Sequence, residues 1–498
     1  MVLANYSLLL PDAWLILMAL IAEVLVICRL RRAIYPSLVF ATLVAAVLYA
    51  ITAYSGKQGH FFYDAYTVDA LTSTFKSILS LAFALTLIYS HDYRRNHHLD
   101  NSEFYMLALF SLFGQILMVS GGDFLVLYLG LEMMSLPLYA LIALQRFDNR
   151  ATEAALKYYV LGALASGILL YGISIIYGAT GSISISDVFV QINNAHINHN
   201  LLVFGLVFIV AGAIFKLGAV PFHMWVPDVY EGSPTAITLL IGAGSKLAAL
   251  AFVMRFLTDS FLSLAVDWQQ MLVVAAALSL IVGNVMGIIQ KNIKRMLAYS
   301  AIGHQGFVLL GLASGFFENS IYSNAITAYT SAYFYSIVYL ITTLGAFAII
   351  MLLSRANTDL DQINDLKGLN RRHPWIAFLM LILMFSMAGI PPTLGFYAKL
   401  LVLSSVVNAN MTWLAVLAVI ASVIGAYYYL RIVKVMYFDE AKAEIEHVTK
   451  IEVMMAEPKT NSSTFLISVN CLALLILGLW PTPLINLSSW AILTAYSL

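Results

Sequence analysis

The chain has 498 residues, of which 61% are hydrophobic and 10% are charged, and its mean hydropathy is +0.87. Because a soluble globular chain carries about 25% charged residues, this composition excludes that class. The formal net charge is zero; it carries no information about nucleic acid, which we do not expect as a partner.

Apolar runs of about 18 residues or more recur from end to end, and such runs indicate transmembrane helices. Only helices and closed barrels satisfy backbone polar groups in lipid, and the alternating pattern of barrel strands is absent. No basic region precedes the first run, which we therefore interpret as an uncleaved helix. The sequence predicts an all-α integral membrane protein, a single polytopic domain over residues 1–498, with about fourteen spans: 13–29, 34–55, 68–90, 103–121, 123–145, 153–179, 201–221, 234–257, 270–290, 295–315, 325–353, 375–405, 411–437 and 463–487.

The connectors between these spans predict the orientation of the chain. Most of the 26 lysines and arginines lie in one alternating set of connectors, whereas the other set contains Lys57 and Arg255. Since basic connectors stay in the cytoplasm, both termini are expected outside, on the periplasmic side of a bacterial inner membrane. The longest polar connectors are 182–200, 354–374 and 438–462.

Two parts of the chain indicate an internal duplication. "GILLYG" (167–172) and "GFVLLG" (306–311) share a pattern, and prolines interrupt both the seventh and the twelfth span. Units of five helices have opposite topologies, and inverted repeats with broken helices are typical of transporters. We predict one repeat over 103–257 and an inverted one over 270–437, flanked by helices in 1–90 and 463–498.

The stretch "AIFKLGAVPFHMWVPDVYEGSPT" (213–235) carries a lysine and three prolines beside an apolar run. Pro221 cannot continue a helix, and "GIPP" (389–392) repeats the interruption in the twelfth span. Non-helical backbone at membrane depth is tolerated only where it faces protein or water. The sequence therefore predicts discontinuous seventh and twelfth helices, although a kink that aids packing is the simpler alternative.

Ionisable residues lie deep within several spans. At a rise of 1.5 Å per residue, Lys246 lies about 18 Å and Glu132 about 14 Å from the start of its span. Such a charge at mid-bilayer costs about 2.5–3.5 kcal/mol, so it should face the bundle interior. Glu132 and Lys216 are expected to pair, either as a static contact or as one that tunes how firmly Lys216 holds its proton. With Lys246, Lys399 and the central His304, they predict a proton path.

Four further residues have an ordinary structural alternative. His223, next to the first break, could cap or pack, and Tyr299 could be a packing aromatic rather than a hydroxyl in a water chain. Lys157 and Lys76 lie near enough to a helix end for their ammonium groups to reach the interface.

No nucleotide-binding or dinucleotide-binding motif is present. Cys28 and Cys471 are isolated in apolar segments, so they cannot hold an iron–sulfur cluster or a zinc ion. The energy for proton movement is thus expected to come from outside this chain.

At these residues the chain resembles the antiporter-like membrane subunits of proton-pumping NADH:quinone oxidoreductase, respiratory complex I. The resemblance covers nearly the whole chain and rests on "YLGLEMMSLPLYALIAL" (128–144), "EAALKYYVLGALASG" (153–167), 213–235, "QKNIKRMLAYSAIGHQG" (290–306) and "GIPPTLGFYAKL" (389–400). Three features favour one type among these subunits. They are the residues after His223, a lysine rather than a glutamate at position 399, and an end soon after the fourteenth span.

The resemblance implies a proton relay of Glu132, Lys216, Lys246 and Lys399, with functional roles for Lys157, His223 and Tyr299. It implies that FMN, iron–sulfur clusters and quinone lie in other subunits and that this chain binds no cofactor or metal. The expected partners are the other membrane and peripheral subunits of complex I and the lipid bilayer. A subunit of a multisubunit cation/proton antiporter, and a scaffold whose buried charges only pack helices, are the alternatives.

Overall fold

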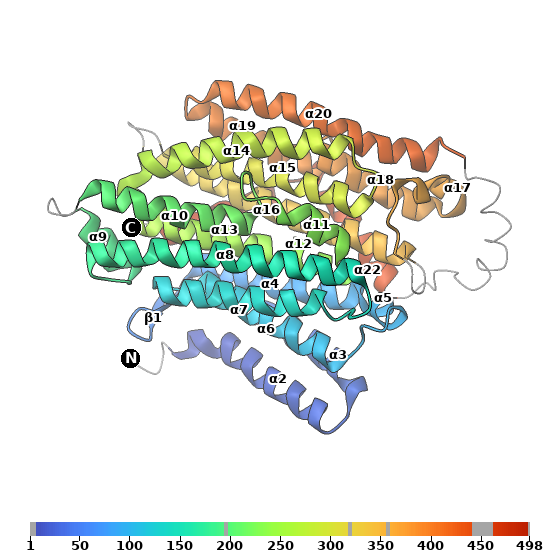
Figure 1. The fold of residues 1–498 in the computed structure, drawn as a ribbon, viewed down its shortest axis with the longest axis horizontal. Helices are drawn as coiled ribbons and strands as arrows, with labels where there is room; N and C mark the ends of the chain where they lie inside the picture. Colours follow the sequence, from blue (N-terminus) through green and yellow to red (C-terminus); the bar gives the residue numbers. More distant parts are fainter. Residues whose placement is uncertain (1–5, 194–197, 317–320, 355–358, 441–461, 497–498) are drawn as a thin grey trace.

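The computed structural model describes residues 6–193, 198–316, 321–354, 359–440 and 462–496, and its regular structure is almost entirely helical (Figure 1). In chain order the elements are η1 (Ser7–Leu9), α2 (Leu10–Ile27), α3 (Arg31–Tyr54), β1 (Gly59–Phe61), β2 (Tyr66–Val68), α4 (Ala70–Tyr89), α5 (His91–Asn96), α6 (Ser102–Ser120), α7 (Phe124–Ile142), α8 (Asn149–Thr180), α9 (Ile185–Ile192), α10 (His199–Leu217), α11 (Trp225–Gly232), α12 (Thr235–Gly242), α13 (Gly244–Met254), the π-helix η2 (Arg255–Ser260), η3 (Leu262–Leu264), α14 (Ala265–Ile288), α15 (Ile293–Ala313), α16 (Ile321–Leu353), η4 (Ile363–Leu366), α17 (Leu369–Arg372), α18 (Pro374–Ala388), α19 (Leu394–Asn408), α20 (Thr412–Tyr437), α22 (Ser462–Leu479) and α23 (Thr482–Tyr496).

The long helices run roughly along one axis, so the bundle has two ends (Figure 1). The described ends of the chain, β1 and α9 lie at one end, which we call the terminal end. Helices α5 and α17 lie at the other, which we call the connector end. Most of the predicted connector 438–462, namely residues 441–461, lies outside the described residues.

Within the described residues, 12 helices are long and apolar enough to cross a membrane, and they match twelve of the fourteen predicted spans. The predicted span 375–405 is the pair α18 and α19, which confirms its discontinuity. The predicted span 463–487 covers α22 and the start of α23, and these two helices meet at a bend of 86°. Pro481 and Pro483 lie at this bend, where proline and its preceding residue disfavour a continuous helix.

The eighth span is also divided, which the sequence did not predict. Helix α12 ends at Gly242, and α13 begins at Gly244 after Ala243 leaves helical geometry with φ −94° and ψ −89°. After α13, the last six residues of this span form the π-helix η2 rather than a further α-helical turn. As a result, Lys246 lies in the first turn of a helix that starts in the middle of the bundle.

Polar residues between the apolar runs determine where many helices begin. The side chains of Asn101, Asp123 and Asn292 accept hydrogen bonds from the backbone N–H groups of α6, α7 and α15 at 2.6–3.0 Å. Such caps satisfy donors that have no partner within the helix. Asp69 caps α4 in the same way, within a capping box that includes Thr72.

At the connector end, the segment that precedes η4 is fastened to three helices by Asp359. Its carboxylate accepts hydrogen bonds from Tyr93 (2.7 Å), Thr235 (3.0 Å) and the buried Lys294 (3.1 Å). Burial opposes ionisation of Asp359, but hydrogen bonding to His97 and the charge of Lys294 hold its pKa well below its usual range.

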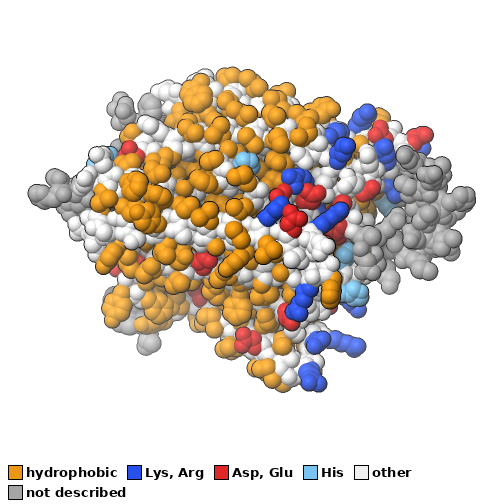
Figure 2. All heavy atoms as spheres, viewed as in Figure 1, with side chains coloured by type: hydrophobic (Ala, Val, Ile, Leu, Met, Phe, Trp, Pro, Cys, Tyr) orange, Lys and Arg blue, Asp and Glu red, His pale blue; other side chains and the backbone are white. Residues whose placement is uncertain are grey.

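The most buried helices occupy the centre of the bundle. The apolar windows of the spans that contain α13 and α15 are completely buried, whereas only 22% of the window that contains α2 is buried. Hydrophobic side chains cover much of the visible surface, and charged ones gather toward the connector end (Figure 2). This pattern fits a bundle covered by lipid or by other apolar protein.

Candidate proton-relay site

The two predicted breaks share one geometry. Helix α10 ends at Leu217 and α18 at Ala388, and each is followed by a glycine in the left-handed region, Gly218 with φ 71° and Gly389 with φ 82°. In both, the residue after the glycine donates a hydrogen bond of 3.0 Å to the carbonyl five residues earlier. This is the Schellman motif, which glycine favours. The predicted discontinuity of the seventh and twelfth helices is therefore confirmed.

A lysine ammonium caps each broken helix. Lys246 Nζ donates to the carbonyl of Leu217 at 2.8 Å and lies 3.4 Å from that of Lys216. Lys399 Nζ donates to the carbonyl of Ala388 at 2.9 Å. These carbonyls have no partner within the helix, and the negative end of the helix dipole favours a cation there. Two predicted site residues thus occupy equivalent positions.

Lys216 is buried in the last turn of α10, but the predicted contact with Glu132 is wrong for this structure. Lys216 Nζ donates instead to Ser135 Oγ at 2.8 Å. Ser135 lies one helical turn beyond Glu132 on α7, so the two share a face. Glu132 Oε1 is buried without a hydrogen-bond partner in the described chain.

His304 lies in the buried interior of α15 between two tyrosines. Its Nδ1 is 2.7 Å from the hydroxyl of Tyr335, and its Nε2 is 3.1 Å from that of Tyr429. A neutral imidazole donates from one nitrogen and accepts at the other. Each nitrogen therefore has a hydroxyl that can complement it, and a proton can enter at one side of the ring as another leaves at the opposite side.

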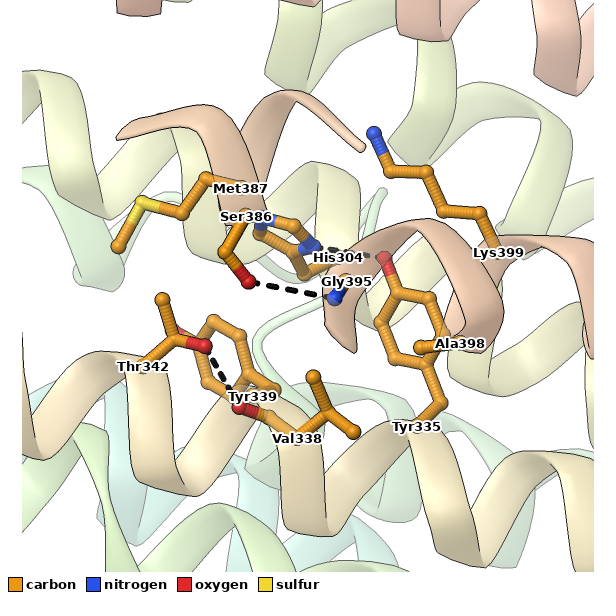
Figure 3. Close-up of a pocket in the computed structure, with 10 residues that line it drawn as sticks. All are labelled: His304, Tyr335, Val338, Tyr339, Thr342, Ser386, Met387, Gly395, Ala398 and Lys399. Atoms are coloured by element: carbon orange, nitrogen blue, oxygen red, sulfur yellow. Dashed lines mark hydrogen bonds between the residues drawn. The ribbon is translucent and has the colours of Figure 1, made fainter. Parts of the chain in front are cut away.

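His304 and Lys399 line one small cavity between α15, α16, α18 and α19. Figure 3 shows His304 joined to Tyr335, while Lys399 extends from α19 toward the end of α18. Tyr339, Thr342 and Ser386 complete the polar lining.

Two tyrosines that the sequence did not single out lie near His304 and near the break between α12 and α13. The ring of Tyr339 lies 5.2 Å from that of His304, and the hydroxyl of Tyr230 is buried without a hydrogen-bond partner in the described chain. A Cβ atom on Gly242, four residues before Lys246, would lie 3.1 Å from the hydroxyl of Tyr230. Tyrosine identity could not reveal these two positions, because the chain contains 28 tyrosines.

Lys157 forms part of an ionic network toward the connector end. Its Nζ contacts Asp228 Oδ2 and Glu153 Oε1, both at 2.8 Å. Arg295 contacts the other oxygen of Asp228 at 2.7 Å and Glu231 at 2.8 Å. The network joins α8, α11 and α15. Its two acidic residues on α11, three positions apart in "PDVYEG", were a signal that the sequence analysis did not use.

The remaining predicted residues lie nearby. His223 is half-buried in the turn between α10 and α11, where its carbonyl accepts from the N–H of Val226 at 2.9 Å. Tyr299 is buried on α15, five residues before His304. No hydrogen bond or ion pair in the described chain joins either side chain to Lys216 or Lys246. Lys76 does not reach the interface as expected: it is buried and paired with Asp12 at 3.3 Å.

Comparison with known proteins finds relatives over nearly the whole chain. The family described as NADH:quinone oxidoreductase/Mrp antiporter, TM, matches residues 121–425. NADH-quinone oxidoreductase subunit N of Paraburkholderia phymatum is 52% identical over 97% of both chains. A chain of respiratory complex I from Thermus thermophilus with bound aureothin has a TM-score of 0.78 at 29% identity and covers 96% of this chain and 99% of its own.

A chain of the Mrp complex from a Dietzia species has a TM-score of 0.82 at 20% identity, over 100% of this chain and 98% of its own, and so shares the fold. The full-length identity to subunit N is much higher, and it agrees with the resemblance found in the sequence. The chain belongs to the NADH-quinone oxidoreductase subunit N family, the proton-translocating, antiporter-like membrane subunits of respiratory complex I.

Proposed function

We propose that this chain carries protons through Lys216, Lys246, His304 and Lys399, with Glu132 setting the proton affinity of the first lysine. One observation carries the proposal: the last carbonyls of α10 accept the ammonium of Lys246, so Lys216 and Lys246 meet at one helix end. From there, the hydroxyls near Tyr339 lead to His304, which shares its cavity with Lys399.

The position of Glu132 supports a control step. Desolvation weakens the hold of a buried ammonium group on its proton, and a nearby carboxylate strengthens it. Lys216 is bonded to Ser135 here, and Glu132 Oε1 is buried without a hydrogen-bond partner in the described chain. A movement of Glu132 into contact would favour a charged Lys216, and its withdrawal would favour proton transfer to Lys246.

The surroundings of the route suggest a direction. We place the connector end in the cytoplasm, since basic residues predominate there, and both termini on the periplasmic side of a bacterial inner membrane. Protons enter near His223 and the network around Lys157, and they leave on the periplasmic side.

The driving reaction lies elsewhere in the complex. The chain is part of NADH:quinone oxidoreductase together with other subunits of that complex. We assign FMN, the iron–sulfur clusters and quinone to those subunits and no redox centre to this chain, so its share of the enzyme is translocation. Quinone reduction then perturbs Glu132 and Lys216 through neighbouring subunits.

The test measures protons moved per NADH oxidised in inverted membrane vesicles that contain the assembled complex. Lys246→Met keeps the volume of the side chain but removes the exchangeable proton, and Glu132→Gln removes the controlling charge. Both are expected to lower the ratio, whereas Lys291→Met, on the exposed Lys291 of a connector, serves as the control. An unchanged ratio in Lys246→Met would refute the route.

Subunits of multisubunit cation/proton antiporters are the second candidate, because the Mrp chain shares the fold. That function predicts that the ratio depends on sodium or potassium gradients. Proton transport that is indifferent to both ions would exclude it.

A further inference from the structure

Helix α13 leads from Lys246 toward the terminal end of the bundle. Asp259 follows Lys246 by thirteen residues, which corresponds to about 20 Å along the axis. The helix finishes as the π-helix η2, which contains Arg255 and Asp259. Such π-helical turns are rare and are often found at functional sites. The sequence placed Arg255 in an outward connector, but its side chain is mostly buried.

Two carboxylates share this one guanidinium group. Arg255 Nη2 contacts Asp69 Oδ2, and Nη1 contacts Asp259 Oδ2 at 2.9 Å. The hydroxyl of Thr258 donates to Asp259 Oδ1 at 2.9 Å. With both carboxylates ionised, the group has an excess negative charge in a largely buried place. One additional proton removes that excess while Asp69 keeps its pairing with Arg255, so Asp259 can accept a proton.

A cavity lies beside Arg255, on the side that leads toward Lys246. Thr72 and Phe75 of α4, Val119 of α6, and Ala251 of α13 contribute to its lining. Nearer Lys246, Gln115 of α6 lies against the start of α13, since its Oε1 would be 2.7 Å from a Cβ atom on Gly244. Polar groups therefore stand at both ends of the space between α4, α6 and α13.

Buried hydroxyls without partners lie in the same region. Those of Tyr333, Thr330, Ser73 and Ser260 make no hydrogen bond within the described chain. The ring of Tyr333 packs against Phe75 at 4.5 Å, and α16 packs along α13. Buried polar groups are almost always hydrogen-bonded, and ordered water is the usual partner where protein supplies none.

We propose that Asp259 is the terminal-end acceptor for protons that leave Lys246 along α13. This outlet rests on the proposed function and gives Lys246 an exit of its own besides the path toward Lys399. The ammonium of Lys246 loses a proton and becomes an amine, and water beside Tyr333 conveys the proton. The Asp259 carboxylate gains it and becomes a carboxylic acid. Release to water at the terminal end restores the carboxylate, which Arg255 stabilises.

The test uses the assembled complex in inverted vesicles and compares Asp259→Asn with Asp187→Asn. Asp187 is exposed on α9 at the same end of the bundle, so it receives the same substitution without the proposed role. We expect Asp259→Asn to lower the protons moved per NADH and Asp259→Glu to recover them. Combined with Lys246→Met, Asp259→Asn should cause no loss beyond that of Lys246→Met alone.

A second variant covers a failure of Asp259→Asn to assemble. Tyr333→Phe removes one hydroxyl and breaks no hydrogen bond of the described chain. It should lower the ratio, whereas Ser422→Ala, which removes a partnerless buried hydroxyl from α20, should not. Suppose that Lys246→Met lowers the ratio, whereas Tyr333→Phe matches its control and Asp259→Asn, where it assembles, matches its own. The proposed outlet is then wrong, and the relay stands. A normal ratio in Lys246→Met overturns both.

Discussion

Replacement of Gly218 by alanine tests whether the end of α10 holds Lys246 in its working position. Gly218 has φ 71°, and a residue with a Cβ atom in this left-handed conformation destabilises the fold by about 1–2 kcal/mol. The new Cβ atom would also lie 2.7 Å from Lys246 Nζ and 2.7 Å from Val226 Cγ2. The ammonium must then leave the carbonyl of Leu217, and a hydrogen bond from a charged group is worth about 1.5–3 kcal/mol. The two costs together amount to about 2.5–5 kcal/mol.

Gly181 provides a matched control, because it ends α8 with φ 73° and nothing lies within 4 Å of its Cβ position. Gly181→Ala incurs the backbone cost alone. The difference of about 1.5–3 kcal/mol is a factor of roughly 10–150 in the occupancy of the Lys246 contact. We expect both variants to lower the yield of assembled complex, measured on native gels, and only Gly218→Ala to lower the protons moved per NADH. Equal ratios in the two variants would refute the assigned position of Lys246.

Two further predictions concern single contacts. Ser135→Ala removes the hydroxyl that holds Lys216 Nζ, so the ammonium of Lys216 should turn to Glu132 and the variant should move fewer protons per NADH. Adding Glu132→Gln to this variant should cause little further loss. Full additivity of the two losses would contradict the coupling of Glu132 and Lys216. Asp359→Asn should destabilise the segment 359–366 by about 1.5–3 kcal/mol at neutral pH, because Lys294 loses its nearest carboxylate; amide hydrogen exchange would measure this. The pKa of Asp359 is depressed in the folded chain, so the contribution of its carboxylate to stability is complete above about pH 4 and declines as the pH falls through the folded-state pKa. A stability difference between the unmodified chain and Asp359→Asn that persists in strong acid would contradict this.

The sequence predicted the features that depend on composition along the chain. Apolar length located the spans, and Pro221 with the "GIPP" stretch located the two breaks. It could not predict the division at Ala243, which no proline marks. Depth within a span also leaves the direction of a side chain open: Glu132 and Ser135 differ by one turn of the same helix, and only the placement of α7 relative to the end of α10 decides which of them meets Lys216. The proposed repeat boundaries at 103–257 and 270–437 remain predictions.

The lysine caps on α10 and α18 have a mechanical consequence. The lysine nitrogen that carries a proton also caps the last carbonyls of a half-helix, so proton binding and helix capping depend on the same contact. A neutral amine attracts a carbonyl dipole less strongly than an ammonium does. We therefore expect the cap on each half-helix to be strong while its lysine is protonated and to weaken when the lysine loses its proton. Each proton that passes would then briefly loosen the helix end that holds the next site in place.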